Sequence, residues 1–312
     1  MPRADQDFAI LVGMSSTAQA KPPVYLIDAS IYIFRAWFSM PTDFSDPAGR
    51  PTNAVYGFAR FLSEFLEETD SRHVAIAFDE SLNTSFRNEI YPDYKANREP
   101  APPELEQQFA WCKDLVRCLG LPVYADDRFE ADDLIATLAH CWREKGHPIC
   151  IVSGDKDLTQ LVGDGDHWWD FARRVKLDPD GVLDKFGVRP DQIADYLALA
   201  GDSVDNIPGV PGIGPKTASA LLAHFDTVEQ LYARIEELPF LKIRGAKSLV
   251  QRLKVHDEDV RIARQLTGLE SAIESVCERP EVERGAAQPD GLDALMDSLG
   301  FGQFLRKRLH QL

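Results

Sequence analysis

Short apolar segments alternate with amphipathic segments along the first half of the chain. Residues 24–28 (VYLID), 74–79 (VAIAFD) and 149–155 (ICIVSGD) are apolar runs of strand length. Between these runs, residues 53–68 and 131–143 carry apolar side chains at helical spacing. Continuous apolar runs are typical of strands buried on both faces of a parallel sheet. The order therefore predicts an α/β domain with a mostly parallel central sheet and flanking helices.

Each of the three predicted strands leads into an aspartate. Asp28 and Asp79 end the first two runs, and Asp155 ends the third. In open α/β sheets, ligands bind at the carboxyl ends of the strands. We therefore expect these three carboxylates to lie at one functional edge of the sheet.

Further acids occur close to this edge in the predicted order of elements. Glu130, Asp132 and Asp133 lie at the start of one predicted helix, Asp157 follows Asp155, and two more acids, Asp202 and Asp205, follow the helix that Pro190 opens and Gly201 closes. Taken singly, each has an ordinary explanation as a helix-dipole partner or a turn former. Together, so many carboxylates could not all ionise at one place without a counter-charge. Oxygen ligands select Mg²⁺ or Mn²⁺, and a pair of such ions about 3.5–4 Å apart is a clamp for phosphoryl displacement.

The second half of the chain has a different character. Three prolines and mixed charge between Ser81 and Glu106 predict a loop, and helices with Pro and Gly punctuation follow residue 177. A last helix is expected at 292–310, packed back on the first domain. The predicted organisation is a loose N-terminal extension (1–23, with Met14 as a candidate start), an α/β domain (24–176) and a helical region (177–312).

Composition limits the class of protein. With 44% hydrophobic residues, no apolar run of membrane length and no signal-peptide pattern, the chain is predicted to be a globular protein. Five cysteines without a CxxC pair argue against a disulfide framework and favour a reducing cytoplasm. The formal net charge of −16 is unexpected for a protein that binds DNA. Gathering the acids in one metal-binding cluster would remove that objection, because the net charge then says little about the rest of the surface.

Several longer strings resemble one known family. They are LIDASIYIFRAW, AVYGFARFL, AFDESLNTSFRNEIYPDYKANR, EADDLIATLA, IVSGDKDLTQL and GDSVDNIPGVPGIGPKTA, in that order over about residues 24–225. The chain resembles the bacterial and phage 5′-nucleases of the flap endonuclease superfamily, which include the N-terminal nuclease domain of DNA polymerase I. The resemblance implies a PIN-like nuclease domain followed by a helix-hairpin-helix region. It places the metal ligands on nine acids: Asp28, Asp79, Glu130, Asp132, Asp133, Asp155, Asp157, Asp202 and Asp205.

The resemblance also implies roles for residues near the arch that the family forms, here expected at about 82–106. Lys95 and Arg98 fall where the family places basic side chains that reach the scissile phosphate. Arg87 lies at the start of the same segment and is expected to help bind DNA. Phe34, or Tyr32 beside it, is a candidate for stacking on an unpaired base, with core packing as the alternative.

The string GVPGIGPKTA resembles the hairpin of a helix-hairpin-helix motif. Gly209, Gly212 and Gly214 would let the backbone approach a phosphate, and Pro215 would open a helix whose free N–H groups face it. Lys216 adds a charge there, and the resemblance also implies a bound K⁺. Basic residues further on would extend the phosphate track or form a solvated helix face: Lys242, Arg244, Lys247, Arg252 and Lys254.

These features predict a Mg²⁺-dependent, monomeric 5′-3′ exonuclease or flap endonuclease that hydrolyses DNA near 5′ ends in replication and repair. Its expected partners are branched or 5′-flap double-stranded DNA and a DNA polymerase. Two alternatives stay open from the sequence. One is a catalytically silent module that binds branched DNA, and the other is a PIN-type ribonuclease.

Overall fold

A single six-stranded sheet forms the centre of the first half of the protein. The computed structural model describes residues 21–41, 43–80, 85–243 and 245–312. The strand order is β3-β2-β1-β4-β5-β6, and every neighbouring pair is parallel except β5 and β6. The strands are β1 (Val24–Asp28), β2 (Val74–Asp79), β3 (Val123–Asp126), β4 (Ile149–Val152), β5 (His167–Asp170) and β6 (Val175–Leu177).

The three strands predicted from apolar runs are confirmed as β1, β2 and β4, and they are neighbours at the centre of the sheet. The other three strands were not predicted, because they are short and only β5 has fully buried positions, which alternate with half-buried ones. The predicted α/β class with a mostly parallel sheet is confirmed.

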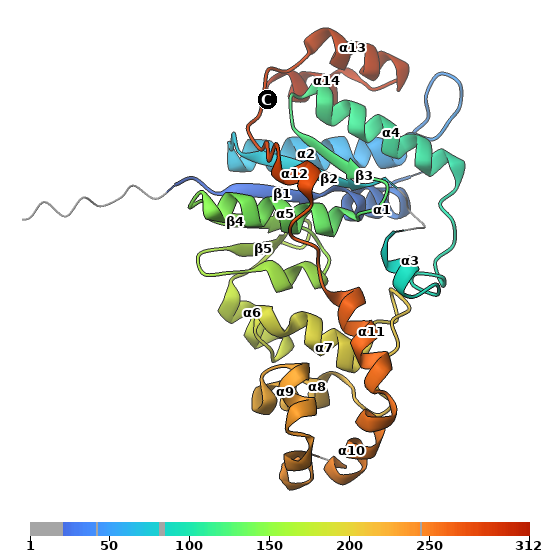
Figure 1. Cartoon of the computed structure of the whole chain (residues 1–312). Helices are drawn as coiled ribbons and strands as arrows, with labels where there is room; N and C mark the ends of the chain where they lie inside the picture. Colours follow the sequence, from blue (N-terminus) through green and yellow to red (C-terminus); the bar gives the residue numbers. More distant parts are fainter. Residues whose placement is uncertain (1–20, 42, 81–84, 244) are drawn as a thin grey trace, which may run out of the picture.

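Helices cover both faces of this sheet (Figure 1). Alternate residues of β1 and β4 point to opposite sides, so that Leu26 and Ile151 join one apolar cluster while Ile27 and Val152 join the other. The second cluster contains α1 (Ala29–Ser39), α2 (Asn53–Thr69) and α4 (Pro103–Cys118). The first contains α5 (Ala131–Glu144) and continues into the helical region. The predicted helices 53–68 and 131–143 are therefore confirmed as α2 and α5.

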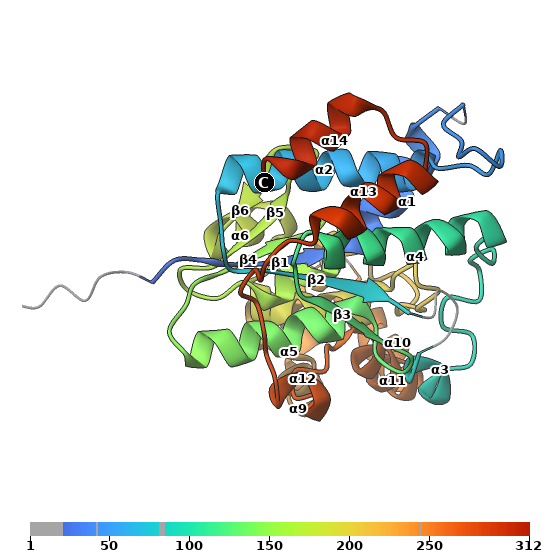
Figure 2. The same ribbon diagram turned by 90° about the horizontal axis from the view of Figure 1, so that it is seen from above.

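The C-terminal segment returns to the first half of the chain. The expected single helix over 292–310 is two helices, α13 (Pro289–Ser298) and α14 (Gln303–His310), separated at Gly300, whose φ is +68°. Figure 2 shows α13 lying along α4 and α14 along α2. Leu292, Met296 and Leu305 are buried in the same cluster as α2 and α4.

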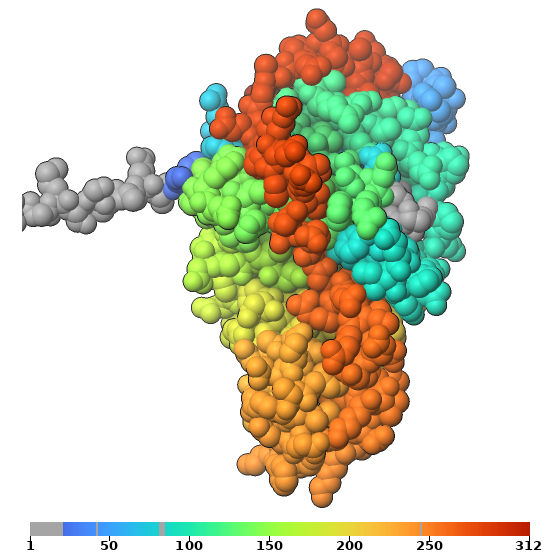
Figure 3. Space-filling model, viewed as in Figure 1, coloured from blue at the N-terminus to red at the C-terminus, as the bar shows by residue number. Residues whose placement is uncertain are grey.

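The helical region forms the lower half of the molecule in Figure 3, coloured yellow to orange. From there, an orange strip of later residues runs upward over the green residues of α5. The elements of this half are α6 (Pro179–Phe186), η2 (Pro190–Gln192), α7 (Ile193–Ala200), α8 (Pro215–Phe225), α9 (Val228–Ala233), η3 (Ile235–Phe240), α10 (Ala246–Val255), α11 (Asp257–Thr267) and α12 (Glu274–Cys277).

The segment expected to form an arch is compact where it is described. After residues 81–84, which are outside the described part, a short helix α3 (Arg87–Ile90) leads into turns up to Pro102. Helix α4 begins at Pro103, so the last four residues of the predicted 82–106 loop are helical. The N-terminal extension lies outside the described residues up to position 20. Among the described helices, none is long and apolar enough to cross a membrane.

Candidate active site

The aspartates after the three central strands meet at one edge of the sheet. Asp28 ends β1, which lies between β2 and β4, and caps α1 by accepting a hydrogen bond from the N–H of Ile31 at 3.4 Å. The hydroxyl of Ser153, just after β4, donates to Oδ2 of Asp28 at 2.8 Å. Asp79, at the end of β2, accepts a hydrogen bond from the N–H of Ala131 at 2.9 Å. The strand ends and the start of α5 are therefore tied together through carboxylates.

A second group of acids adjoins the first. The backbone N–H of Asp157 donates to Oδ1 of Asp155 at 2.9 Å, which holds the Asp155 side chain against the turn after β4. Asp202 pairs its backbone with Ile207 and thereby closes the loop that carries Asp205. A cavity of about 380 Å³ is lined by all four of these acids: Asp155, Asp157, Asp202 and Asp205.

Burial and mutual repulsion make these carboxylates hard to ionise. Burial, with the nearby charges of Asp79 and Asp155, raises the pKa of Asp28 to about 7 against the lowering effect of Ser153. Burial and the charge of Asp155 likewise raise the pKa of Asp157 to about 7. Burial and the charges of Asp155, Asp28 and Asp79 raise the pKa of Asp132 well above its usual range. Acids that repel one another in this way favour a bound cation.

Cations of the chain itself lie among these acids. The ammonium of Lys156 donates to Asp202 and lies 3.3 Å from Oδ1 of Asp157. That Oδ1 atom is buried and accepts no hydrogen bond. Within the described ranges, no three Asp, Glu, His or Cys side chains are gathered as tightly as one metal ion requires. The donor set nevertheless fits Mg²⁺ or Mn²⁺, because it consists of carboxylate oxygens and includes an unsatisfied one.

The segment after α3 docks on the loop that carries Asp205. The Nζ of Lys95 donates to Oε1 of Glu130 at 2.7 Å and lies 3.9 Å from Oδ2 of Asp205. The hydroxyl of Tyr94 is 3.1 Å from both Glu130 and Asp205, and Arg98 donates to Oδ1 of Asp205. Burial raises the pKa of Glu130, but Lys95 and Arg87 outweigh it and lower the pKa overall. Lys95 and Arg98, which were expected to reach the scissile phosphate, therefore lie beside the acids.

Two expectations are corrected by the structure. Asp133 is fully buried, and each of its oxygens accepts one hydrogen bond from Arg87 and one from a backbone N–H, of Glu130 or of Glu270. It has no free oxygen for a metal ion. Arg87 is only 1% exposed and cannot contact DNA from this position. The two residues form a buried ion pair beside the acidic edge.

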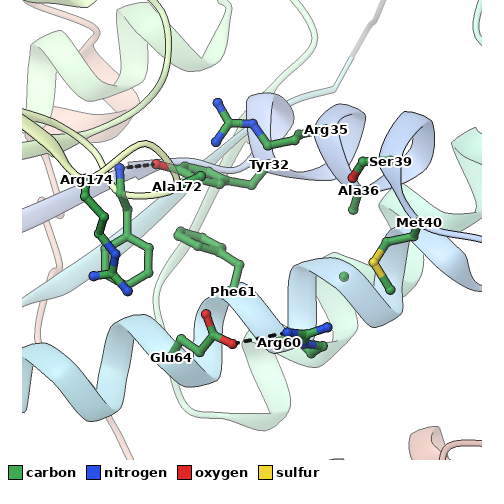
Figure 4. A pocket seen from close by; sticks show the side chains of 12 residues that line it. Tyr32, Arg35, Ala36, Ser39, Met40, Arg60, Phe61, Glu64, Ala172 and Arg174 are labelled. Atoms are coloured by element: carbon green, nitrogen blue, oxygen red, sulfur yellow. Dashed lines mark hydrogen bonds and ion pairs between the residues drawn. The ribbon is translucent and has the colours of Figure 1, made fainter.

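The aromatic residues after Asp28 belong mostly to the core. The ring of Tyr32 stacks on Phe61 with centroids 3.7 Å apart, and its hydroxyl accepts from the N–H of Phe171. Phe34 is half-buried and meets Phe109 edge-on at 5.4 Å. Figure 4 shows the hollow beside Tyr32 and Phe61, which Arg35, Arg60 and Arg174 surround. Arg35 also lies close to Gly154, because a Cβ on Gly154 would be 3.1 Å from Nη2 of Arg35.

The predicted hairpin leads into α8 as expected, with Gly214 as the N-cap and Pro215 as the first helical residue. Its glycines differ in role. A Cβ on Gly209 would lie 2.3 Å from the carbonyl carbon of Ala200, so this glycine is required for internal packing rather than for DNA. Gly212 has a φ of +82°, and a Cβ on Gly214 would meet open space. Lys216 is exposed next to Gly214.

One residue of the predicted basic track touches the hairpin: Arg252 donates to the carbonyl of Pro211 at 3.0 Å. Lys242, Lys247 and Lys254 are exposed, and Arg244 lies outside the described residues. Three side chains that contact the acids were not predicted from the sequence: Ser153, Tyr94 and Lys156. Each lies within one to two residues of an assigned site residue, but only the fold shows its partner.

A mostly parallel central sheet with acids at its carboxyl edge, followed by a helical region, is the arrangement of the PIN-like nuclease folds. Residues 23–187 match the model of the 5′-3′ exonuclease N-terminal resolvase-like domain, and residues 188–290 match that of the 5′-3′ exonuclease C-terminal SAM fold. The chain belongs to the 5′-3′ exonuclease family.

Its relatives are longer proteins. The chain is 38% identical to DNA polymerase I of Bacillus caldotenax over 293 residues and 38% identical to DNA polymerase I of Pseudomonas aeruginosa over 293 residues. These matches cover 92% and 94% of the chain, but only 32% of either relative. The chain therefore spans about a third of the length of the curated relatives it matches.

Two solved structures share the fold. The T5 5′-exonuclease with divalent metal ions (zinc) bound aligns with a TM-score of 0.64 at 21% identity, over 93% of this chain and 97% of that chain. The catalytic core of Rad2 in complex with DNA substrate aligns with a TM-score of 0.58 at 17% identity, over 94% and 92%.

Proposed function

We propose that this protein is a metal-dependent 5′-3′ exonuclease and flap endonuclease that hydrolyses DNA phosphodiester bonds near 5′ ends, in replication and repair. The observation that carries the proposal is the convergence of buried carboxylates from three neighbouring strand ends and from the 202–205 loop. Family membership and the metal ions and DNA bound to proteins of the same fold support it.

The residues proposed to hold divalent cations, Mg²⁺ or Mn²⁺, are the predicted acids other than Asp133, whose two oxygens each accept two hydrogen bonds. These are Asp28, Asp79, Glu130, Asp132, Asp155, Asp157, Asp202 and Asp205. When bound, such ions neutralise the charge of a phosphate and lower the pKa of an attacking water. We expect two of them, as in other phosphoryl-transfer sites. A bound ion would compete with the ammonium of Lys156 for Oδ1 of Asp157. We therefore expect Lys156 to move away from that oxygen when the ions bind.

The roles of the chain's own cations follow from their positions. Lys95 donates to Glu130 and Arg98 to Asp205. We expect both cations to contact a phosphate bound at the acidic edge. Preorganised cations stabilise the additional negative charge that develops on a transferring phosphoryl group. Arg98 is 40% exposed, so it is free to turn toward a substrate.

The helix-hairpin-helix region would bind the duplex by its backbone. The first turn of α8 has no side-chain cap at Gly214, and Lys216 in this turn is exposed. Such a helix end binds phosphate without reading sequence. We propose branched or 5′-flap DNA as the substrate and a DNA polymerase as a partner. A K⁺ at the hairpin also stays a proposal.

The test is a labelled 5′-flap duplex incubated with the protein in Mg²⁺, in Mn²⁺ and in a chelator. The proposal expects cleavage near the junction with either metal and none with the chelator. Binding without cleavage in both metals would instead identify a silent branched-DNA-binding module. Faster cleavage of an RNA flap than of a DNA flap would identify a ribonuclease.

A further inference from the structure

Arg87 is the bulkiest fully buried side chain among the described residues. It opens the short helix α3, which Figure 1 places next to α11. All three guanidinium nitrogens donate hydrogen bonds. Removing a charged guanidinium from water costs free energy, and breaking one of its buried contacts would leave the charge uncompensated. The contacts of Arg87 therefore fix the relative positions of the segments that they join.

On one side, Arg87 closes the end of α11. Its Nε donates to the carbonyl of Leu266 at 2.9 Å and one terminal nitrogen donates to that of Gly268 at 2.9 Å. The last carbonyls of a helix have no partner within the helix and form the negative end of its dipole. A guanidinium is therefore a favourable partner for them. Through these bonds, the segment after β2 is joined to the end of α11.

On its other side, Arg87 holds the start of α5. Its two terminal nitrogens donate to the two oxygens of Asp133 at 2.7 Å each, and one of them also reaches Glu130 at 3.2 Å. Glu130 is the residue that accepts from Lys95. One side chain thus connects the end of α11 to the carboxylate that places Lys95.

The end of α11 is itself anchored to the remaining acids. The hydroxyl of Thr267, the last residue of α11, donates to the carbonyl of Ala194 in α7, the helix that leads into Asp202. The amide of Gln160 donates both to the carbonyl of Thr267 at 3.1 Å and to that of Asp157 at 2.9 Å. Through Ala194 and Gln160, the end of α11 is therefore connected to the segments that carry Asp202 and Asp157.

We propose that Arg87 is a positioning residue for the nuclease reaction. It fixes the position of Glu130 relative to the end of α11, and Glu130 in turn positions Lys95. The helical region and the acidic edge are thereby held in a fixed relative orientation. Arg87 itself does not touch DNA. The proposal rests on the proposed nuclease function.

The test is Arg87→Lys, with Arg143→Lys as the matched control. Lysine keeps the positive charge but cannot form the bidentate hydrogen bonds that Arg87 makes with Asp133. Arg143 also pairs with a buried aspartate, Asp166, but at the other end of α5. We expect Arg87→Lys to lower kcat by about tenfold or more, as loss of a supporting contact does at metal sites. Its affinity for flap DNA in chelator should stay within about twofold, and Arg143→Lys should keep the wild-type kcat.

A readout without catalysis separates this proposal from the nuclease function. Hydrogen exchange of backbone amides in 93–98 and at the start of α5 should accelerate in Arg87→Lys and not in Arg143→Lys. If the wild-type protein cuts no flap, the proposed function fails, and the exchange measurement still decides on Arg87. If Arg87→Lys does not fold, the double variant Arg87→Met with Asp133→Leu removes both buried charges together.

That double variant should fold and show the same loss of kcat. Four results would overturn the proposal: wild-type kcat in a folded Arg87 variant, unchanged exchange in 93–98, an equal loss of kcat in Arg143→Lys, or failure of both Arg87 variants to fold. The last result would make Arg87 a residue required for folding alone.

Discussion

The hydroxyl of Ser153 donates a 2.8 Å hydrogen bond to Oδ2 of Asp28 and also accepts one from the N–H of Asp155 at 3.0 Å. One side chain therefore sets the distance between the acids that follow β1 and β4. The same bond stabilises the ionised form of Asp28 and lowers its pKa, against the larger effect of burial. Metal binding at this edge is expected to depend on Ser153.

Replacing Ser153 by alanine should raise the pKa of Asp28 further and release Asp155. We expect a loss in kcat of about 10- to 100-fold in Mg²⁺ and a shift of the acid limb of the pH–rate profile to higher pH. Ser63→Ala is the control, because Ser63 is also fully buried but donates only to the carbonyl of Arg60 on α2. Equal pH profiles for Ser153→Ala and wild type would remove Ser153 from the site.

The raised pKa values of Asp28 and Asp157, both to about 7, predict opposite pH dependences for activity and for stability. Cleavage in Mg²⁺ should increase as pH rises through 7, because only the ionised acids bind the cation. Without metal, the folded protein holds protons that the unfolded chain releases above about pH 4. The free energy of unfolding should therefore fall as pH rises from about 4 to 7, through these two groups.

Thermal unfolding in chelator across that pH range tests the second part, and the same scan with Mg²⁺ is the comparison. Added Mg²⁺ should raise the Tm more at pH 8 than at pH 5.5. A Tm that responds equally to Mg²⁺ at both pH values would contradict the assignment of Asp28 and Asp157 as groups that exchange protons for metal.

Lys95→Ala and Arg98→Ala should reduce kcat without unfolding the protein. The expected loss is about 10²- to 10³-fold for Lys95, in the range found when a preorganised charge-stabilising group is removed. It should be smaller for Arg98, whose side chain is more exposed. Arg117→Ala is the control, since Arg117 pairs with Asp114 on the surface of α4. Normal single-turnover rates for Lys95→Ala would place the scissile phosphate elsewhere.

Gly214→Ala tests the proposed contact between the hairpin and DNA. An added Cβ there would meet no atom within 4 Å, so the free energy of unfolding should change little. If a phosphate lies against this backbone, the Kd for duplex DNA should rise by about tenfold or more, a loss of at least 1.4 kcal/mol. Gly302→Ala is closely matched, because Gly302 is also an N-cap glycine facing open space. Equal DNA affinity in both variants would contradict the contact.

The sequence pattern predicted the strands that carry the site because those strands are buried on both faces. Their apolar runs are continuous, and each leads into an aspartate. β5 (HWWD) escaped prediction because its two tryptophans are not part of a longer apolar run and His167 and Asp170 bound it. That these aspartates lie close together could be predicted because the carboxyl ends of parallel strands meet at one edge of the sheet. The remaining strands were not needed for this prediction.

The partners of individual side chains could not be predicted in the same way. Asp132 and Asp133 are adjacent on α5 and therefore point in directions about 100° apart. Only the packing of α11 against α3 shows that Asp133 faces the buried Arg87 while Asp132 faces the other acids. The carbonyls that accept hydrogen bonds from Arg87 are about 180 residues away along the chain. The sequence near Arg87 therefore does not indicate that its side chain is buried.

Binding of Mn²⁺ tests the central claim most directly, because it needs neither DNA nor catalysis. Electron paramagnetic resonance of free Mn²⁺ during titration gives the number of ions bound by the wild type and by Asp155→Ala. We predict about two bound ions per wild-type chain, in line with two-metal sites, and loss of at least one in Asp155→Ala. Equal binding by the two proteins, or none by the wild type at millimolar Mn²⁺, would contradict the claim that these carboxylates form a metal site.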